Sequence, residues 1–300
     1  MNRYRAIRTF LIRCSVLFST LLLSTEVMAQ AIPSSKVADG TEPAWSPDGE
    51  WILMSVLTGN QRDLYVVRPD GSERRQITDT PESELLGTWS RDGRIAFVKP
   101  TDNGLQLFVM ETPLADARRS HEVQFREHSP AFTSAPWTPD GLGLTVVVGE
   151  RNELDIYRVP LDGALPTPLV SSAGYDSSPA WSVDGRLAFV SERSGNRDIW
   201  VQGRDGGPHP VTMASASDDS PAWSPDGRWI AFVSDRSGAR EIHVVPAEGG
   251  AAMQLTNDAA WAAYPAWSPD GSTLAYVLVT RGRGNDHLKV VTIPDDLRGQ

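Results

Sequence analysis

A tryptophan-centred motif recurs six times and constrains the fold of this chain more than any other feature. The tryptophan returns at intervals of 44, 48, 44, 42 and 44 residues, at Trp45, Trp89, Trp137, Trp181, Trp223 and Trp267. In every copy Ser or Thr follows it, then one variable residue and Asp-Gly, as in the fifth copy, Pro221-Ala-Trp-Ser-Pro-Asp-Gly227. Self-similarity at a fixed period of about 20 to 50 residues is typical of solenoids and propellers.

Each repeat divides into four short β-strands. In the fifth copy, the tryptophan strand is followed by a Pro-Asp-Gly turn and a β-rich run at residues 229–233. A polar loop, a second run at 242–245, a turn at Glu248-Gly249 and a short run ending at Leu255 complete the unit. Two hairpins per repeat predict a four-stranded antiparallel meander. The absence of a long 3.6-residue periodicity excludes a helical solenoid.

Four-stranded units repeated around a ring are the blades of a β-propeller. The sequence therefore predicts an all-β, six-bladed propeller. The sixth repeat has no convincing fourth strand after Val291, whereas residues 34–37 precede Trp45 just as the fourth strands precede the later tryptophans. We therefore expect the N-terminal strand to complete the last blade and close the ring.

The first 29 residues have the three parts of a secretory signal peptide. Four arginines precede an apolar run at residues 14–24, and Val27-Met28-Ala29 has the small-residue spacing of a cleavage site. We predict cleavage near Ala29, a propeller domain over residues 30–300 and a periplasmic or secreted protein. An uncleaved anchor is the alternative, but the apolar run is about half of the roughly 20 residues that span a bilayer.

Charge and cysteine content restrict the partners of the mature domain. Cys14, in the predicted leader, is the single cysteine, so no disulfide is expected. Without the leader, 24 basic residues stand against 37 acidic ones, a net charge of −13. Such a surface repels nucleic acid and anionic headgroups. We expect a monomer that binds no nucleic acid, does not insert into membranes and needs no cofactor, with a protein, peptide, cation or neutral glycan as ligand.

The repeat resembles the TolB-type, WD-like propeller unit. The resemblance rests on the Pro-Ala-Trp-Ser-Pro-Asp-Gly motif and on the segments Ser191-Glu-Arg-Ser-Gly-Asn-Arg-Asp-Ile-Trp200 and Ser234-Asp-Arg-Ser-Gly-Ala-Arg-Glu-Ile-His243. It covers the predicted propeller domain and implies a propeller that binds proteins or peptides in the cell envelope. Peptidase propellers carry related repeats. No counterpart of the TolB N-terminal α/β domain is expected.

Charged residues gather on the face of the ring that carries the longer loops, here called the long-loop face. Acid–arginine pairs follow the second strand of three repeats, and carboxylates lie five residues before three of the tryptophans, with Asp219 beside one of them. These residues are Glu150-Arg151, Glu192-Arg193, Asp235-Arg236, Glu84, Asp176 and Asp218. They predict an acidic rim around the channel that captures a basic peptide or a cation. Alternatively, the pairs are structural salt bridges between blades, and the carboxylates cap backbone amides.

Two aromatic residues, Trp261 and Tyr264, have no counterparts in the other repeats. They are candidates for partner contacts on the long-loop face, or for burial beneath a neighbouring loop. The five histidines are scattered without metal-ligand spacing, and His243 occupies a position that holds an aromatic residue in other repeats. We therefore predict no metal site and no catalytic residue.

Three functions fit these patterns. The favoured one is a non-enzymatic binding scaffold of the cell envelope, because most charged positions recur from blade to blade, whereas a catalytic residue should deviate in one or two blades. The alternatives are a hydrolase or lyase acting on glycans and an accessory subunit of a separately encoded hydrolase.

Overall fold

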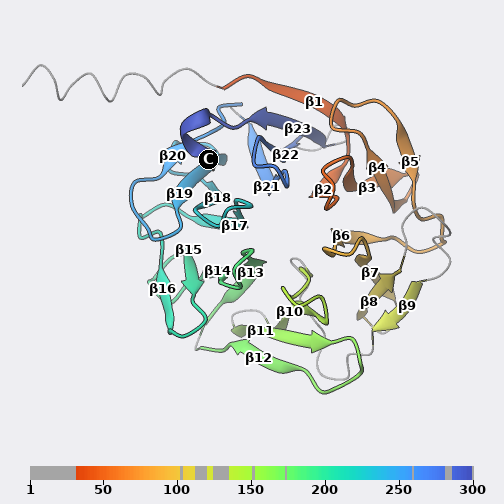
Figure 1. The fold of residues 1–300 in the computed structure, drawn as a ribbon, viewed down its shortest axis with the longest axis horizontal. Helices are drawn as coiled ribbons and strands as arrows, with labels where there is room; N and C mark the ends of the chain where they lie inside the picture. The colour runs from red at the N-terminus through yellow and green to blue at the C-terminus, as the bar shows by residue number, and fades with distance from the viewer. Residues whose placement is uncertain are drawn as a thin grey trace, which may run out of the picture. The chain divides into compact units, whose positions relative to one another are not determined.

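The computed structural model describes residues 32–101, 104–111, 120–123, 135–150, 153–172, 174–258, 260–280 and 286–298. Within these ranges the chain forms six antiparallel sheets arranged as the blades of a ring (Figure 1) and contains no α-helix. The predicted six-bladed β-propeller is thus confirmed. The predicted leader and its cleavage site lie outside the described residues.

Blades one to five take their strands in chain order from the centre of the ring outwards, and blade six does so except for its outermost strand. Blade one contains β2 (Thr41–Trp45), β3 (Ile52–Thr58), β4 (Gln61–Val67) and β5 (Arg74–Gln76), and blade two contains β6 (Leu85–Trp89), β7 (Ile95–Thr101), β8 (Gly104–Met110) and β9 (Ser120–Val123). Blade three contains β10 (Gly143–Glu150), β11 (Glu153–Pro160) and β12 (Thr167–Val170), with a bridge from Trp137 to Leu144 on the inner side.

Blades four and five follow the same order, and blade six takes its outermost strand from the N-terminal end of the described residues. Blade four contains β13 (Asp176–Trp181), β14 (Leu187–Ser191), β15 (Asp198–Gln202) and β16 (Pro208–Pro210), and blade five contains β17 (Asp218–Trp223), β18 (Trp229–Ser234), β19 (Glu241–Pro246) and β20 (Met253–Gln254). Blade six contains β21 (Trp261–Trp267), β22 (Thr273–Val279), β23 (His287–Thr292) and β1 (Ser34–Asp39), and a 3-10 turn at Asp295–Leu297 follows.

The N-terminal strand closes the ring as predicted. Strand β1 pairs antiparallel with β23, with Ser34 opposite Val291 and Asp39 opposite His287. Blade six therefore combines the first and the last strands of the chain (Figure 1). This pairing covers the outer edge of β23, which would otherwise be open to intermolecular pairing.

The turn after each inner strand is built from its own side chains. In blade one, the Ser46 hydroxyl donates to Asp48 Oδ1 at 2.5 Å and accepts from the Trp51 amide at 2.9 Å, while Gly49 takes the left-handed conformation at φ 72°. The equivalent Ser or Thr donates to the equivalent Asp in all the other blades. These turns define the opposite face of the ring, here called the turn face.

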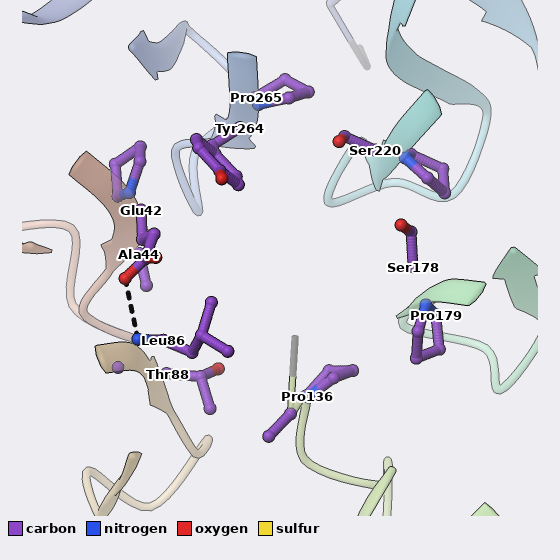
Figure 2. Close-up of a pocket in the computed structure, with 14 residues that line it drawn as sticks. Glu42, Ala44, Leu86, Thr88, Pro136, Ser178, Pro179, Ser220, Tyr264 and Pro265 are labelled. Atoms are coloured by element: carbon purple, nitrogen blue, oxygen red, sulfur yellow. Dashed lines mark hydrogen bonds between the residues drawn. The ribbon is translucent and has the colours of Figure 1, made fainter. Parts of the chain in front are cut away.

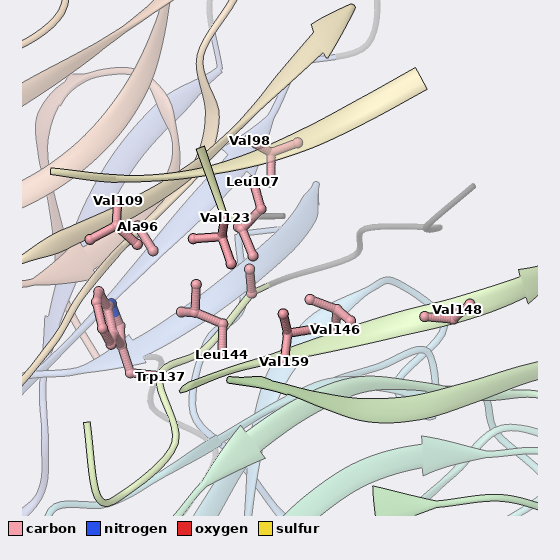
Figure 3. Close-up of a cluster of buried hydrophobic side chains, with 11 residues drawn as sticks. Ala96, Val98, Leu107, Val109, Val123, Trp137, Leu144, Val146, Val148 and Val159 are labelled. Atoms are coloured by element: carbon pink, nitrogen blue, oxygen red, sulfur yellow. The ribbon is translucent and has the colours of Figure 1, made fainter. Parts of the chain in front are cut away.

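Apolar side chains fill the space between neighbouring blades. Between blades two and three, Val98, Leu107 and Val109 pack against Leu144 and Val146, and all five are almost completely buried (Figure 3). Full burial of one such side chain contributes about 1.5 to 3 kcal/mol. This packing holds the inner strands at fixed positions around the central channel.

Candidate functional site

A cavity of about 170 Å³ lies at the centre of the ring, where the inner strands converge (Figure 2). Every blade contributes to its wall, through Glu42, Pro43, Ala44, Leu86, Gly87, Thr88, Ala135, Pro136, Ser178, Pro179, Ser220, Pro221, Tyr264 and Pro265. This narrow cavity is the inner part of the candidate site.

The cavity is ringed by residues in an unfavourable backbone conformation. In five blades, the residue three positions before the tryptophan has a positive φ, namely 58° at Glu42, 54° at Leu86, 49° at Ser178, 52° at Ser220 and 53° at Tyr264. Each lies at a β-bulge, where the register between the inner strand and the second strand shifts. The left-handed conformation costs roughly 1 to 2 kcal/mol for a residue with a side chain. Strain of this kind clusters at functional sites.

The five strained residues differ chemically although their surroundings recur. The Pro-Ala-Trp-Ser motif is nearly constant, whereas the position before it is Glu, Leu, Ser, Ser or Tyr. Sequence reasoning identified Tyr264 but missed Glu42, Leu86, Ser178 and Ser220. These residues could have been identified from the sequence, because the position three residues before the tryptophan varies within an otherwise nearly constant repeat.

Glu42 connects the first two blades. Its Oε2 accepts a hydrogen bond from the Ser55 hydroxyl within blade one and another from the Leu86 amide of blade two, each at 2.8 Å (Figure 2). The carboxylate is thereby held at the cavity wall. Glu42 is the one charged residue among those that line the narrow cavity.

A wider cavity of about 450 Å³ opens from this ring towards the long-loop face. We call it the channel mouth; its wall includes Glu42, Leu85, Leu86, Tyr175, Ser178, Asp219, Ser220, Arg240, Trp261 and Tyr264. Trp261 and Tyr264 are exposed by 41% and 39%. Both residues lie in the inner strand β21 and neither is fully buried, while their contact with a partner stays a prediction.

Asp219 ties blades four and five together at the channel mouth. Its Oδ1 accepts from the Ser220 amide at 2.7 Å, and its Oδ2 lies 3.1 Å from Arg197 Nη1 and 3.8 Å from Arg240 Nη2. The Arg197 guanidinium stacks over Tyr175 at 4.6 Å. The negative charge of Asp219 is therefore matched by two arginines.

Three of the predicted rim carboxylates, Glu84, Asp176 and Asp218, are completely buried. Each is paired with a basic residue of its own blade: Glu84 with Lys99 at 3.1 Å, Asp176 with Arg193 at 2.9 Å and Asp218 with Arg236 at 2.7 Å. The inner strands of blades four and five begin at these aspartates, which places the carboxylates inside the sheet. Arg193 and Arg236 therefore pair with buried aspartates of their own blades, and not with the acidic residues that precede them or with a neighbouring blade.

The remaining predicted residues are more dispersed. Glu192 is exposed and pairs with Arg197 at 3.1 Å, while exposed Asp235 accepts from the Ser217 amide at 2.9 Å. Arg151 and the side chain of Glu150 lie outside the described residues. His243 is buried against Phe232, as expected for a packing residue.

Among the described residues, no three His, Cys, Asp or Glu side chains come together in an arrangement able to hold a metal ion. No helix within the described part of the chain is long and apolar enough to cross a bilayer.

Comparison with known proteins agrees with the repeat pattern. The family model described as TolB beta propeller domain matches residues 208–295. A TolB homologue from Chlorobium luteolum is 34% identical over 142 residues, which are 47% of this chain and 31% of that protein. The chain therefore spans about a third of the length of this relative.

Solved structures show the same fold. The crystal structure of TolB from Acinetobacter baumannii matches with a TM-score of 0.66 and 18% identity, over 90% of this chain and 66% of that one. An oligogalacturonate lyase from Vibrio parahaemolyticus matches with a TM-score of 0.58 and 11% identity, over 90% and 99%. At such identities the likeness concerns the fold alone. The chain is thus a six-bladed β-propeller, and its residues 208–295 match the TolB beta propeller domain.

Proposed function

We propose that this chain is an exported, non-enzymatic propeller that holds a protein or peptide of the cell envelope at its channel mouth. The observation that carries the proposal is the ring of strained residues. Five residues, of four different kinds, adopt the same costly conformation around one cavity, while the repeat around them is nearly constant. Backbone strain clusters at binding and active sites, and the variation of the side chains at this position supports a role in binding.

The composition of the channel mouth supports a macromolecular ligand. Trp261, Tyr264 and Arg240 border it, and aromatic and arginine side chains are the residues that most often dominate binding energy at protein interfaces. Leu85 and Leu86 add apolar surface beside Glu42 and the serine hydroxyls. The volume of about 450 Å³ lies within the range of pockets that enclose a ligand.

Site-specific photo-crosslinking tests the proposal. A photoreactive phenylalanine analogue would replace Tyr264 at the channel mouth or Leu142, which is 65% exposed on the turn face. In cells that export the chain, we expect a crosslinked protein from position 264 and none from position 142. Substitution of Trp261 by alanine should weaken the adduct. Equal adducts from both positions, or none from either, would contradict binding at the channel mouth.

An enzyme acting on glycans is the second candidate. The exposed indole of Trp261 could stack on a sugar ring, and an oligogalacturonate lyase shares the fold. Incubation with oligogalacturonate and measurement of new chain ends tests this function. We expect no cleavage. Cleavage that disappears in Glu42→Gln would replace the binding proposal with an enzymatic one.

A further inference from the structure

Among the described residues that line the narrow cavity, Glu42 is the one that carries a charge. The other residues around the narrow cavity are prolines, alanines, Gly87, Leu86 and residues with hydroxyl groups. Within the described ranges, the partners of the Glu42 carboxylate are the Ser55 hydroxyl and the Leu86 amide, and no basic side chain forms an ion pair with it. The Glu42 carboxylate is therefore held by two hydrogen bonds and by no ion pair among the described residues.

The geometry leaves one oxygen of Glu42 for a ligand. Both hydrogen bonds end on Oε2. A carboxylate has about four acceptor positions, so Oε1 keeps its acceptor capacity. The left-handed backbone at Glu42 and the bond to the next blade fix the direction of the side chain (Figure 2). A fixed, under-used acceptor suits a cationic donor, because charge-assisted hydrogen bonds are the strongest that proteins form.

The charged groups around the Tyr264 hydroxyl are mostly negative, as Glu42 is. Burial raises the pKa of the Tyr264 hydroxyl, and the negative charges of Glu42, Asp219 and Asp286 raise it further, against Arg62 alone. Asp219 is already bound to Arg197 and Arg240. Glu42 is thus the carboxylate of the channel mouth that is best placed to receive an additional cation.

The size of the narrow cavity favours a single side chain. Its volume of about 170 Å³ would hold about six water molecules. It is smaller than the roughly 300 Å³ at which pockets for small organic ligands begin. Leu86, Pro136 and Pro265 offer apolar surface on which the alkyl stem of a long basic side chain can lie while its charged end reaches a polar group.

We propose that the narrow cavity receives one lysine or arginine side chain of the partner, with its charged end on Glu42 and its stem between Leu86 and Tyr264. This inference rests on the proposed function and defines its partner as a basic segment of a protein. The Tyr264 ring, which lines the same cavity, would add a cation–π contact.

Peptide retention tests the inference. The purified exported protein is passed over two immobilised mixtures of short peptides, one with a central lysine and one with N-acetyl-lysine at the same position. We expect acetylation to lower the retention of wild type at least about tenfold, as loss of a charge-assisted hydrogen bond implies. Glu42→Gln keeps the shape and the acceptor for the Leu86 amide, and it should bind both mixtures equally.

A matched variant separates this site from the general acidity of the protein. The side chain of Glu248 is 84% exposed in a turn on the turn face, away from the cavity. Glu248→Gln therefore changes the net charge of the protein by the same amount as Glu42→Gln and leaves the cavity unchanged. We expect Glu248→Gln to keep the preference for lysine. Urea unfolding of Glu42→Gln would verify that it is folded as wild type is.

Three results would overturn the inference: equal retention of the two mixtures by wild type, retention of neither, or a preference for lysine that survives in Glu42→Gln. The photo-crosslink from position 264 distinguishes its failure from failure of the proposed function. If that adduct forms while the lysine preference is missing, the channel mouth binds a partner of another kind. If both are missing, both proposals fall.

Discussion

The indole Nε1 of Trp45 in blade one donates a hydrogen bond to the carbonyl oxygen of Ala266 in blade six, at 3.1 Å and across 221 residues of sequence. Equivalent bonds join Trp223 to Ala180 and Trp267 to Ala222. The repeated tryptophan therefore attaches each of these blades to the preceding one, and Trp45 uses the same bond to join the two ends of the ring.

Trp89 provides a natural control for this bond. Its Nε1 is buried and has no hydrogen-bond partner among the described residues. We expect Trp45→Phe to lower the free energy of unfolding more than Trp89→Phe does, by about 0.5 to 1.5 kcal/mol, because only Trp45→Phe breaks a hydrogen bond. Urea unfolding followed by circular dichroism measures both. Equal losses would show that packing, and not the hydrogen bond, determines the contribution of this tryptophan.

Removal of β1 should open the last blade. A chain that begins at residue 40 lacks the strand that pairs with β23, whereas one that begins at residue 32 retains it. We expect the shorter chain to aggregate, because the exposed edge of β23 can pair with other molecules. Light scattering and size-exclusion chromatography compare the two chains. A shorter chain that stays monodisperse and equally stable would contradict a closing role for β1.

The buried pair of Asp218 and Arg236 should be sensitive to loss of one partner. Arg236→Met leaves the fully buried Asp218 carboxylate without its counter-charge, so we expect a loss of about 3 to 5 kcal/mol in the free energy of unfolding. The double variant with Asp218→Asn removes the unpaired charge and should recover part of this loss. A double-mutant cycle in urea measures the coupling. Strictly additive losses would indicate that the pair does not act as a unit.

Acid should destabilise the turn face. In Asp48, Asp140 and Asp270, the hydrogen bond from the turn hydroxyl lowers the pKa of the carboxyl below its ordinary value of 3.8. A carboxyl with a lower pKa in the folded state stabilises the fold above its unfolded pKa and loses that contribution as pH falls through the folded value. The free energy of unfolding should therefore fall steadily below about pH 4.

Substitution of the turn aspartates tests this origin of the acid sensitivity. We expect Asp48→Asn and Asp270→Asn to reduce the dependence of unfolding free energy on pH, since the substituted side chain no longer titrates. Asp296→Asn, at an exposed carboxyl of the 3-10 turn, serves as the control. An unchanged pH dependence in the turn variants would locate the acid-sensitive groups elsewhere.

Glycine should be tolerated better at a strained ring position than beside it. Ser178 has a φ of 49°, whereas its neighbour Ser177 lies buried in the same strand without a positive φ. Ser178→Gly relieves the left-handed strain, so it should be less destabilising than Ser177→Gly by about 1 kcal/mol. Thermal unfolding of the two variants measures the difference. A greater loss in Ser178→Gly would mean that its side-chain contacts outweigh the strain.

The blades could be predicted because their signals are local and recur six times. Turn residues such as Asp48 and Gly49, and the apolar runs between the turns, determine each hairpin independently of the rest of the chain. The closing strand was also predictable, since residues 34–39 supply the strand that the last repeat lacks.

The strained ring could not be predicted from local preference. Ser178, Ser220 and Tyr264 each precede a proline, and a residue before proline ordinarily favours an extended conformation. The bulge that turns them to positive φ is instead a property of the inner strand within the closed ring. The carboxylates of Asp176 and Asp218 were placed on the surface for a related reason. Their spacing from the tryptophan does not show that the strand already begins there.

The sharing of blade six between the two ends of the chain also restricts when the fold can be completed. During synthesis, residues 34–39 emerge well before their partner strand, which ends at Thr292. Until then the ring has a gap and the edges on either side of it are unprotected. Under the export that we propose, this delay is an advantage, because premature closure would block passage of the chain through a membrane.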